Sequence, residues 1–377
     1  QKTAYEIRLS LVGSEMCIRD RDQHDHSAGH THVTELAALE LGIGMHTAFA
    51  AVRSLRRGQT RAGKPFFDIR LSDRTRTIAG KIWSDASRAM AVADELKSGD
   101  HVKALFEIDE YKGALQLSIK GLRIATPGEP GFDATLLVDE GFDLVADLLC
   151  DTLVFDIETV PAVDLRKVPS TIAQAVAKHA ERNEWDETKV MSLSPYFGQV
   201  VSLAVGNGEQ DPRTQDVTVF VVPPKGAPTT TLPSWIRPVT EAELLRAFWT
   251  LAGHASCVVS YNGRMFDVPF MIGRSLIHEV PVRVDLSSAP YSLRPHLDLY
   301  GLVAPGGFGR GPASLDVVCW ALGFASPKES MDGSMVAATY AKGDVGQIAL
   351  YNAGDVRATT AVYQRVRDGV LRFRDDW

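Results

Sequence analysis

The pattern of apolar residues changes once along this chain, at the turn-rich segment TPGEPG (residues 126–131). Before that segment the apolar residues form short alternating runs typical of strands, whereas after it apolar strands alternate with amphipathic helices. Two such patterns separated by Gly and Pro predict two domains, and 377 residues is enough chain for both. We therefore predict one domain over residues 45–125, a linker over residues 126–150 and a second domain over residues 151–377.

The first domain is expected to contain only strands and one helix. Its pattern predicts five strands with a polar helix between the third and the fourth, an order that suggests the five-stranded barrel of an OB fold. The expected strands are Ala48–Arg56, Pro65–Leu71, Thr77–Trp83, His101–Asp109 and Ala114–Ile124, and the helix is Asp85–Lys97.

The second domain is expected to be of the α/β class, because its strands and helices alternate. The expected strands are Leu153–Ile157, Val200–Val205, Val217–Val222 and Cys257–Tyr261, and the expected helices are Glu241–Leu251, Arg264–His278 and Val345–Asp368.

Residues 1–44 do not have the pattern of a folded segment, and we predict that they are disordered or non-native. Gln1–Arg21 lacks the apolar stretch and cleavage site of a signal peptide and resembles translated adapter sequence. The histidines that follow fit a solvated disordered tail better than the alternative, a metal-binding tail. They are His24, His26, His30 and His32.

Charge is distributed unevenly between the two domains. The net charge of the chain is -7, yet residues 45–125 hold 15 Lys and Arg against 9 Asp and Glu. Local charge decides which molecules a surface attracts, so the first domain is expected to bind a polyanion. No run of about 18 apolar residues occurs, and we expect no membrane partner. The four cysteines are scattered, which disfavours a zinc site or a disulfide framework and fits a reducing cytoplasm.

The sequence FDIET places two carboxylates on an apolar strand. Residues two apart on a strand point to the same face, so Asp156 and Glu158 project together. Adjacent carboxylates in apolar surroundings repel each other and lose hydration, and a divalent cation relieves both costs. Oxygen ligands of this kind suit Mg²⁺ or Mn²⁺. Taken alone, the pair fits a solvated strand end equally well.

Two further segments contain candidate partners for these carboxylates. Asp267 follows an apolar strand, with Asn262 five residues before it, and a helix-capping aspartate is the alternative. Tyr351 and Asp355 lie four apart and therefore on one face of the C-terminal helix. In isolation that pair is more often a surface pair than a site.

Together and in this order, these residues resemble the DEDD exonucleases of the RNase H-like (DnaQ-like) superfamily, in the subclass that has a tyrosine. The surrounding sequences narrow the resemblance to the predicted 3′→5′ exonuclease family related to the proofreading domains of family-B DNA polymerases. The sequences that resemble this family are DIETVP, SYNGRMFDVPFMIGRS, HLDLYG, SLDVVCWALG, DGS and YNAGDV.

The resemblance implies an RNase H-like fold, a mixed sheet with flanking helices, and a site for two divalent metal ions. By that likeness Asp156 bridges both metals, Glu158 and Asp355 complete the first, and Asp267 serves the second. Tyr351 orients the attacking water through its hydroxyl, since its ordinary pKa near 10 disfavours a general base at neutral pH.

Further residues are expected to bind the substrate. Near the carboxylates these are Asn262, Arg264 and Phe266, although a solvated helix face explains Arg264 about as well. His296 and Asp298 in HLDLYG are better explained as a strand-end pair that supports the fold than as a contact near the site.

In the first domain, basic residues occur among aromatic ones, the combination with which OB folds hold single strands. The residues assigned to the substrate there are Arg57, Lys64 and Tyr111. Trp83 and one of Phe66 and Phe67 are expected in the barrel core. This domain also resembles the OB fold that precedes the catalytic region in some bacterial exoribonucleases.

The function predicted from the sequence is a metal-dependent 3′→5′ exonuclease that binds single-stranded nucleic acid, DNA rather than RNA. Two alternatives stay open, namely an exoribonuclease and a nucleic-acid-binding scaffold without catalysis. The sequence does not identify protein partners.

Overall fold

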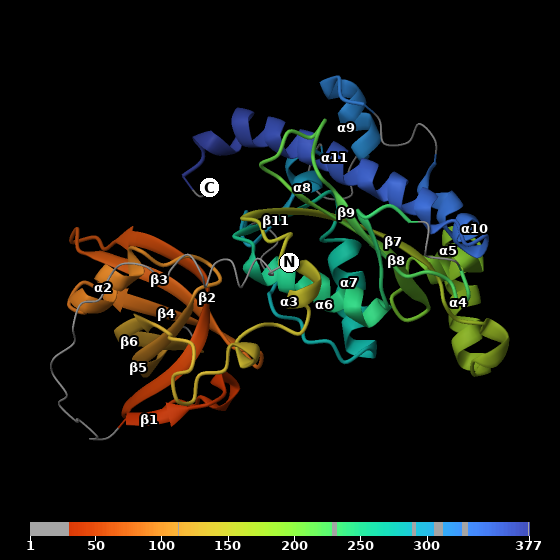
Figure 1. Ribbon diagram of the computed structural model, residues 1–377. Helices are drawn as coiled ribbons and strands as arrows, with labels where there is room; N and C mark the ends of the chain where they lie inside the picture. Colours follow the sequence, from red (N-terminus) through yellow and green to blue (C-terminus); the bar gives the residue numbers. More distant parts are fainter. Residues whose placement is uncertain are drawn as a thin grey trace. The chain divides into compact units, whose positions relative to one another are not determined.

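The computed structural model describes residues 30–111, 113–227, 232–288, 292–304, 312–325, 331–375 and 377. The chain forms two compact units, Gln1–Asp147 and Leu148–Trp377. Each unit is considered by itself below, and Figure 1 labels the elements of both. No described helix combines the length and the apolar character needed to cross a membrane.

The first unit contains a closed five-stranded barrel, so the predicted OB fold is confirmed. The long strand β2 pairs with both β3 and β5, and the circle closes because β4 pairs with β6 and β6 with β5. The elements are β2 (Met45–Gln59), β3 (Pro65–Ser72), β4 (Thr77–Trp83), α2 (Ser87–Ala93), β5 (His101–Tyr111) and β6 (Ala114–Ile124).

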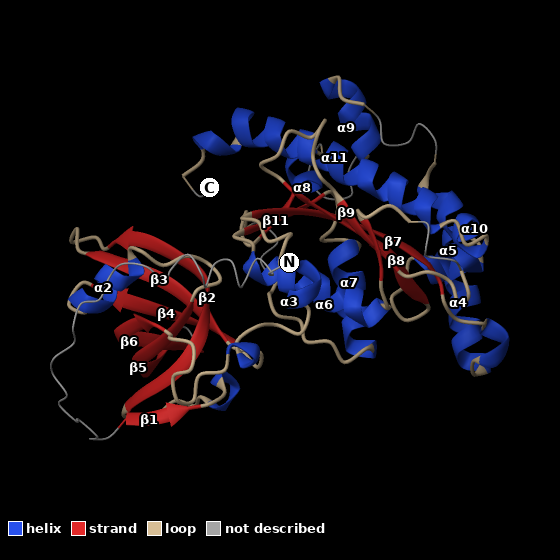
Figure 2. Cartoon of the chain, viewed as in Figure 1, coloured by secondary structure: helices blue, strands red, loops and turns tan. Residues whose placement is uncertain are grey.

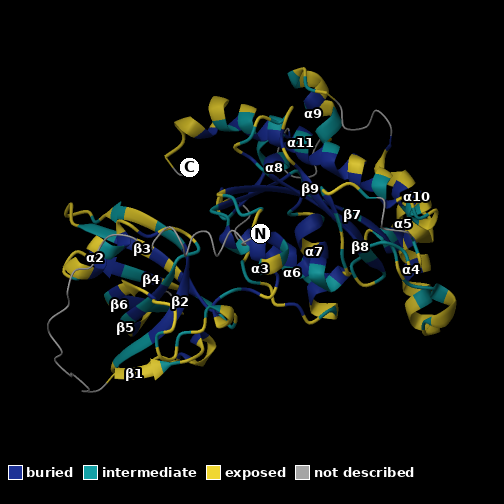
Figure 3. Cartoon of the chain, in the orientation of Figure 1, coloured by how far each residue is buried: buried dark blue, intermediate teal, exposed yellow. Residues whose placement is uncertain are grey.

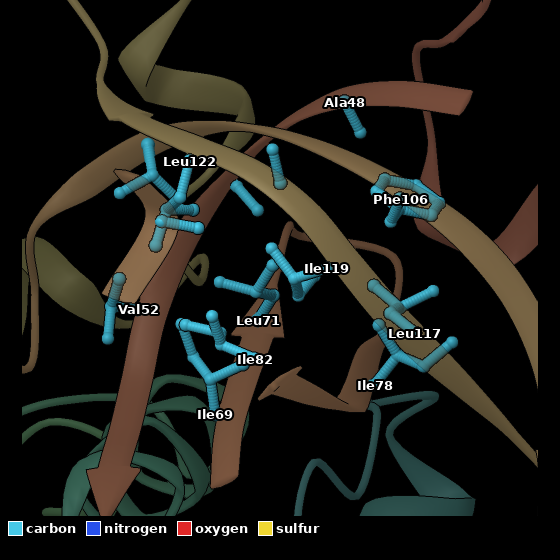
Figure 4. Close-up of a cluster of buried hydrophobic side chains, with 14 of the residues drawn as sticks. Ala48, Val52, Ile69, Leu71, Ile78, Ile82, Phe106, Leu117, Ile119 and Leu122 are labelled. Atoms are coloured by element: carbon cyan, nitrogen blue, oxygen red, sulfur yellow. The ribbon is translucent and has the colours of Figure 1, made fainter. Parts of the chain in front are cut away.

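Alternate residues of each barrel strand point inward and fill the barrel with branched aliphatic side chains. Figure 4 shows Val52, Ile69, Ile82 and Leu117 converging with their neighbours in this core. β2 reaches two neighbours because its pairing register shifts between Val52 and Ser54, a bulge that bends the strand.

The predicted disorder of residues 1–44 is wrong over residues 30–44. Strand β1 (His30–Val33) pairs in parallel with β2, and a 3₁₀ helix, η1 (Leu36–Ala38), follows it. Leu36 and Leu39 are buried in the barrel core, and the Leu36 amide donates a 2.6 Å hydrogen bond to Asp73 Oδ2. Burial of these two leucines accounts for the order of the segment. Residues 1–29, with His24 and His26, lie outside the described residues.

Much of the predicted linker packs on the barrel. It contains η2 (Ala134–Leu136) and α3 (Phe142–Val145), and Leu137 is buried against Phe49 and Ala51. Arg53 Nη2 lies 2.7 Å from Asp139 Oδ2, and both side chains are buried. A buried ion pair of this kind fixes the segment, although its Pro- and Gly-rich beginning suggested a free connection.

The second unit is built on a six-stranded mixed sheet in the order β10-β9-β8-β7-β11-β12. β7 is antiparallel to β8 and parallel to β11, so it lies in the middle of the sheet. The strands are β7 (Thr152–Pro161), β8 (Gly198–Asn207), β9 (Thr218–Val221), β10 (Ile236–Pro238), β11 (Cys257–Ser260) and β12 (His296–Asp298). With the helices described next, this sheet confirms the predicted α/β fold class.

Helices cover both faces of the sheet (Figure 2). The long helix α11 lies along one face, where Val154 and Val356 belong to one buried cluster. Helix α6 lies on the other face, where the rings of Phe155 and Phe248 contact each other at a tilt, with centres 4.7 Å apart. The helices are α4 (Ser170–Asn183), α5 (Glu187–Ser192), α6 (Glu241–His254), α7 (Asp267–Ile277), α8 (Leu299–Val303), α9 (Leu315–Leu322), α10 (Val336–Ala341) and α11 (Val345–Gly369), with 3₁₀ turns at Leu165–Lys167, Gly333–Met335 and Leu371–Phe373.

The two faces of β7 have different chemistry, and this decides where the polar residues lie. Phe155 and Ile157 are buried on the face toward α6, whereas Val154 shares the opposite face with α11. Because neighbours alternate along a strand, Asp156 and Glu158 lie on the α11 face. Figure 3 shows α11 buried along its sheet side and exposed along the other.

Candidate active site

Three carboxylates from β7 and α11 gather on the α11 face of the sheet. Asp156, Glu158 and Asp355 each offer an oxygen, and these oxygens all lie within 4.8 Å of one another. Asp355 is buried and the other two are partly exposed. Such a set of hard oxygen ligands is what Mg²⁺ and Mn²⁺ prefer.

A fourth carboxylate reaches the same stretch of β7 from a different element. Asp267 is the first residue of α7 and is only 5% exposed. Its Oδ1 accepts a 3.2 Å hydrogen bond from the backbone amide of Ile157, the residue between Asp156 and Glu158. The structure therefore brings together all four carboxylates that the sequence singles out.

Asp156 and Asp267 hold negative charge at high cost. Burial raises the pKa of Asp156 well above its ordinary value, and the charges of Asp267, Asp355 and Glu158 raise it further. Burial also raises the pKa of Asp267 to about 7, against the opposing effect of its backbone hydrogen bonds. Divalent cations would remove this repulsion, so the donor set fits a metal centre.

Tyr351 lies one helical turn before Asp355 and is buried beside it. Its pKa is raised above the ordinary value, first by burial and then by the charges of Asp355, Glu158 and Asp156. A protonated phenol can donate a hydrogen bond, whereas an ionised carboxylate such as Asp355 can only accept one. The hydroxyl therefore keeps its proton and acts as a hydrogen-bonding group.

Asn352, which no sequence motif indicates, helps to dock α11. This amide is fully buried, and its Nδ2 donates a 2.9 Å hydrogen bond to Ser202 Oγ on β8. Ser202 is the register partner of Glu158 on β7. The contact therefore fixes α11, with Tyr351 and Asp355, over the strands beside the other carboxylates. The only sequence signal is a polar residue within each of two apolar elements.

The loop between β11 and α7 positions the predicted substrate residues. Asn262 has a φ of 64°, and a Cβ at Gly263 would collide with Ser260 Oγ, so the chain turns tightly here. Phe266 is partly buried, and its ring packs at a tilt against that of Phe270, with ring centres 5.6 Å apart. The structure thus places Asn262 and Phe266 on the turn that leads to Asp267.

Arg264 is engaged by the protein itself. Its guanidinium donates to the carbonyls of Ser292, at 3.1 Å, and His296. These contacts anchor the Arg264 side chain to the neighbouring loop. Arg274 is buried and pairs with Glu241 through two hydrogen bonds.

His296 and Asp298 are buried at the end of β12 and support the loop, as the sequence predicts. His296 Nε2 lies 2.7 Å from Ser260 Oγ, and burial lowers the pKa of this histidine to about 4. Asp298 accepts backbone hydrogen bonds from Asn262 and Arg264, while burial raises its pKa.

On the barrel, one of the two expectations for core aromatics is wrong. Phe67 is buried as predicted, but Trp83 is 38% exposed. Trp83 is the register partner of Phe66, and both take outward positions of the alternating strands. Lys81 Nζ lies 4.3 Å from the centre of the Phe66 ring and 5.4 Å from that of Trp83. We call Phe66, Lys81 and Trp83 the barrel platform.

The residues predicted to bind substrate on the barrel lie at separate places. Arg57 pairs with Asp94 at 2.9 Å, and its guanidinium lies 5.7 Å from the centre of the Phe67 ring. Lys64 is exposed in the turn before β3, and Tyr111 is exposed at the end of β5. Arg57 is the register partner of Phe67 on the adjoining strand, whereas Gly58 is the partner of Phe66.

Comparison with known families gives a match to the predicted 3′-5′ exonucleases related to the exonuclease domain of PolB, over residues 217–372. This range contains Asp267, Tyr351 and Asp355, so the resemblance predicted from the motifs is confirmed there. A curated relative, the 3′-5′ exoribonuclease YhaM of Geobacillus sp. (strain WCH70), is 31% identical over 83 residues. That match covers 22% of this chain, and the chain spans about a quarter (24%) of the relative's length.

Two solved structures give more distant similarities. The family B DNA polymerase of Pyrobaculum calidifontis is 15% identical, with a TM-score of 0.41, over 85% of this chain and 46% of that one. The second OB-fold domain of replication protein A from Methanococcus maripaludis is 19% identical, with a TM-score of 0.21, over 26% of this chain and 98% of that one.

Proposed function

We propose that this protein is a metal-dependent 3′→5′ exonuclease that hydrolyses the terminal phosphodiester of single-stranded nucleic acid, with DNA preferred to RNA. One observation carries the proposal: four carboxylates and a tyrosine from β7, α7 and α11 converge at one place on the sheet. The match to an exonuclease family over residues 217–372 supports the same reaction.

Two divalent ions fit the donor set. Asp156, Glu158 and Asp355 would hold the first, and Asp156 with Asp267 the second. Bound metals of this kind activate a water and stabilise the leaving 3′ oxygen. Tyr351 keeps its proton and orients the attacking water by a hydrogen bond, while Asn262 and Phe266 hold the terminal nucleotide.

The polymer can be DNA or RNA, and each has one supporting comparison. The family description relates the matched region to the exonuclease domain of a DNA polymerase, which supports DNA. The similarity to an exoribonuclease supports RNA as the second candidate. The barrel would raise the local concentration of either strand, because stacking platforms are tolerant of sequence.

The test uses 5′-labelled single-stranded DNA and RNA of one sequence, incubated with the full chain in Mn²⁺. We expect a ladder that shortens one nucleotide at a time from the 3′ end, with DNA degraded faster. A strand with a blocked 3′ end serves as control and should stay intact. Shortening from the 5′ end would refute the proposed polarity, and binding without shortening would favour the scaffold alternative.

We expect Trp83→Ala to weaken binding of single strands through the barrel. Loss of one stacking ring costs about 1–3 kcal/mol, which raises the Kd roughly 5- to 150-fold. Fluorescence anisotropy with a labelled oligonucleotide measures this change. Trp185→Ala is the matched control, because Trp185 is also 38% exposed and has a lysine, Lys189, 4.5 Å from its ring centre. Equal losses in both variants would show that the barrel platform has no special role.

A further inference from the structure

The backbone of Asn262 is held in an uncommon conformation while its side chain is left available. Its φ of 64° lies in the left-handed region, which Asn tolerates better than most residues but which still needs support from its surroundings. The side chain is partly buried. Among the described residues the amide group has no hydrogen-bond partner, so it is free to bind a ligand.

Asp298 supplies the support for this conformation. Its Oδ1 accepts the backbone N–H of Asn262 at 2.8 Å, and its Oδ2 accepts that of Arg264 at 2.9 Å. The two oxygens therefore hold the amides on either side of Gly263. Oδ1 also accepts the N–H of Tyr300 at 3.0 Å, which fixes the orientation of the carboxylate.

The position of Asp298 in the sheet makes this contact possible. Asp298 ends β12 directly opposite Ser260, the last residue of β11, and is 5% exposed. The turn that begins after Ser260 must therefore pass over the Asp298 carboxylate. The Gly263 carbonyl in turn accepts the Val268 N–H at 2.8 Å, so the clamped turn continues directly into α7, where Asp267 lies.

We infer that Asp298 is a positioning residue, which clamps the turn so that the free Asn262 amide meets the 3′-terminal nucleotide. The inference rests on the proposed function, because it assigns the Asn262 amide to that nucleotide. Asp298 itself touches neither substrate nor metal. Its contribution should therefore appear only while Asn262 has a side chain to position.

The first test is a double-mutant cycle measured as KM and kcat for strand shortening in Mn²⁺. Asp298→Asn turns an amide N–H₂ toward a backbone N–H, and two donors cannot form a hydrogen bond. We expect kcat/KM to fall about 10- to 100-fold, mainly because KM rises. Asn262→Gly keeps the left-handed turn without the amide and should cause a similar loss. In the Asn262→Gly background, Asp298→Asn should add less than about threefold, because the residues act as a unit.

Asp285→Asn is the matched control. Asp285 also accepts two backbone N–H groups, from Ser287 and Ser288, but it lies in an exposed turn. The kcat/KM of the Asp285→Asn variant should therefore stay within about twofold of that of the intact protein. Thermal unfolding identifies variants that do not fold, and Asp298→Ser then replaces Asp298→Asn. Fully additive losses, or unchanged activity in a folded Asp298 variant, would overturn the inference.

A binding measurement separates this inference from the proposed function. The affinity for a linear oligonucleotide is compared with that for a circular one in Ca²⁺, with strand integrity checked afterwards. The barrel should bind both alike, so the ratio reports recognition of a strand end, and a linear strand with a blocked 3′ end shows whether that end is the 3′ end. If the intact protein prefers the linear strand but never shortens it, the proposed function fails. The inference still holds if the Asp298→Asn variant loses the preference for the linear strand. It is overturned if the intact protein has no such preference, or if the variant keeps it unchanged.

Discussion

Asp156→Asn is expected to stop strand shortening and, in the same variant, to raise the thermal stability of the metal-free protein. Burial and three neighbouring carboxylates raise the pKa of Asp156 well above its ordinary value, so the charged form is held at a cost. The amide keeps the shape of the side chain and removes its charge. Activity should fall by at least about 10³-fold, as expected when roughly 4 kcal/mol of metal-mediated stabilisation is lost.

The measurements are rates of shortening in Mn²⁺ and thermal unfolding in EDTA. Asp164→Asn is a suitable control, because its carboxylate is hydrogen-bonded to Arg166, which lowers its pKa. Neutralising the Asp164 carboxylate should leave the rate of shortening unchanged and should not raise the thermal stability of the metal-free protein. An active Asp156→Asn protein would exclude Asp156 from the metal centre. A destabilised one would show that the carboxylate cluster is not strained.

Asp267 is expected to make the stability of the metal-free protein fall as the pH rises from about 4 to about 7. The pKa of Asp267 is about 7 in the folded protein, against an ordinary value of 3.8. Between these values the folded protein retains a proton that the unfolded chain has released, so raising the pH favours unfolding. Mn²⁺ should reverse the loss, and its stabilising effect should be larger at pH 8 than at pH 5.

The effect has to be measured as a difference, because a buried histidine acts in the opposite direction. The pKa of His296 is lowered to about 4, so its contribution to stability rises between about pH 4 and pH 6.5. Subtracting the unfolding free energies of Asp267→Asn from those of the intact protein cancels His296. The difference should decline across the window in EDTA. A flat or rising difference would contradict the raised pKa of Asp267.

The central part of the second unit could be predicted from sequence because its signals are local. β7 is an apolar run with two acids at alternate positions, and the prediction of Leu153–Ile157 falls within the observed Thr152–Pro161. The predicted helix Val345–Asp368 matches α11 within one residue, since Asp344 caps its beginning. The spacing of Tyr351 and Asp355 then places both on the face toward the sheet.

Other features depend on contacts that no local pattern reveals. α4 has only Val176 and Ala180 buried, so its apolar pattern is too weak to predict the helix. Leu36 and Leu39 become informative only when the barrel that receives them is known. On β3 and β4, alternate residues face the barrel core, and Phe66 and Trp83 belong to the set that faces outward. Composition alone does not show which set of alternate residues faces the core.

The same holds for the residues that align the candidate site. The hydrogen bond from Asn352 to Ser202 and the clamp by Asp298 each join residues far apart in sequence. Single polar residues in apolar elements are common, and only the fold shows which of them meet. The carboxylates were therefore predictable as a set, while the parts that hold them in place were not.

The dependence of the site on α11 has a consequence for the newly made protein. The β7 carboxylates are synthesised early in the second unit, but Tyr351 and Asp355 arrive with its last long helix. A nascent or truncated chain that lacks α11 therefore cannot assemble the cluster. If the cluster cuts nucleic acid, this order of synthesis withholds that activity on the ribosome, beside abundant RNA, until α11 has been made and has packed on the sheet.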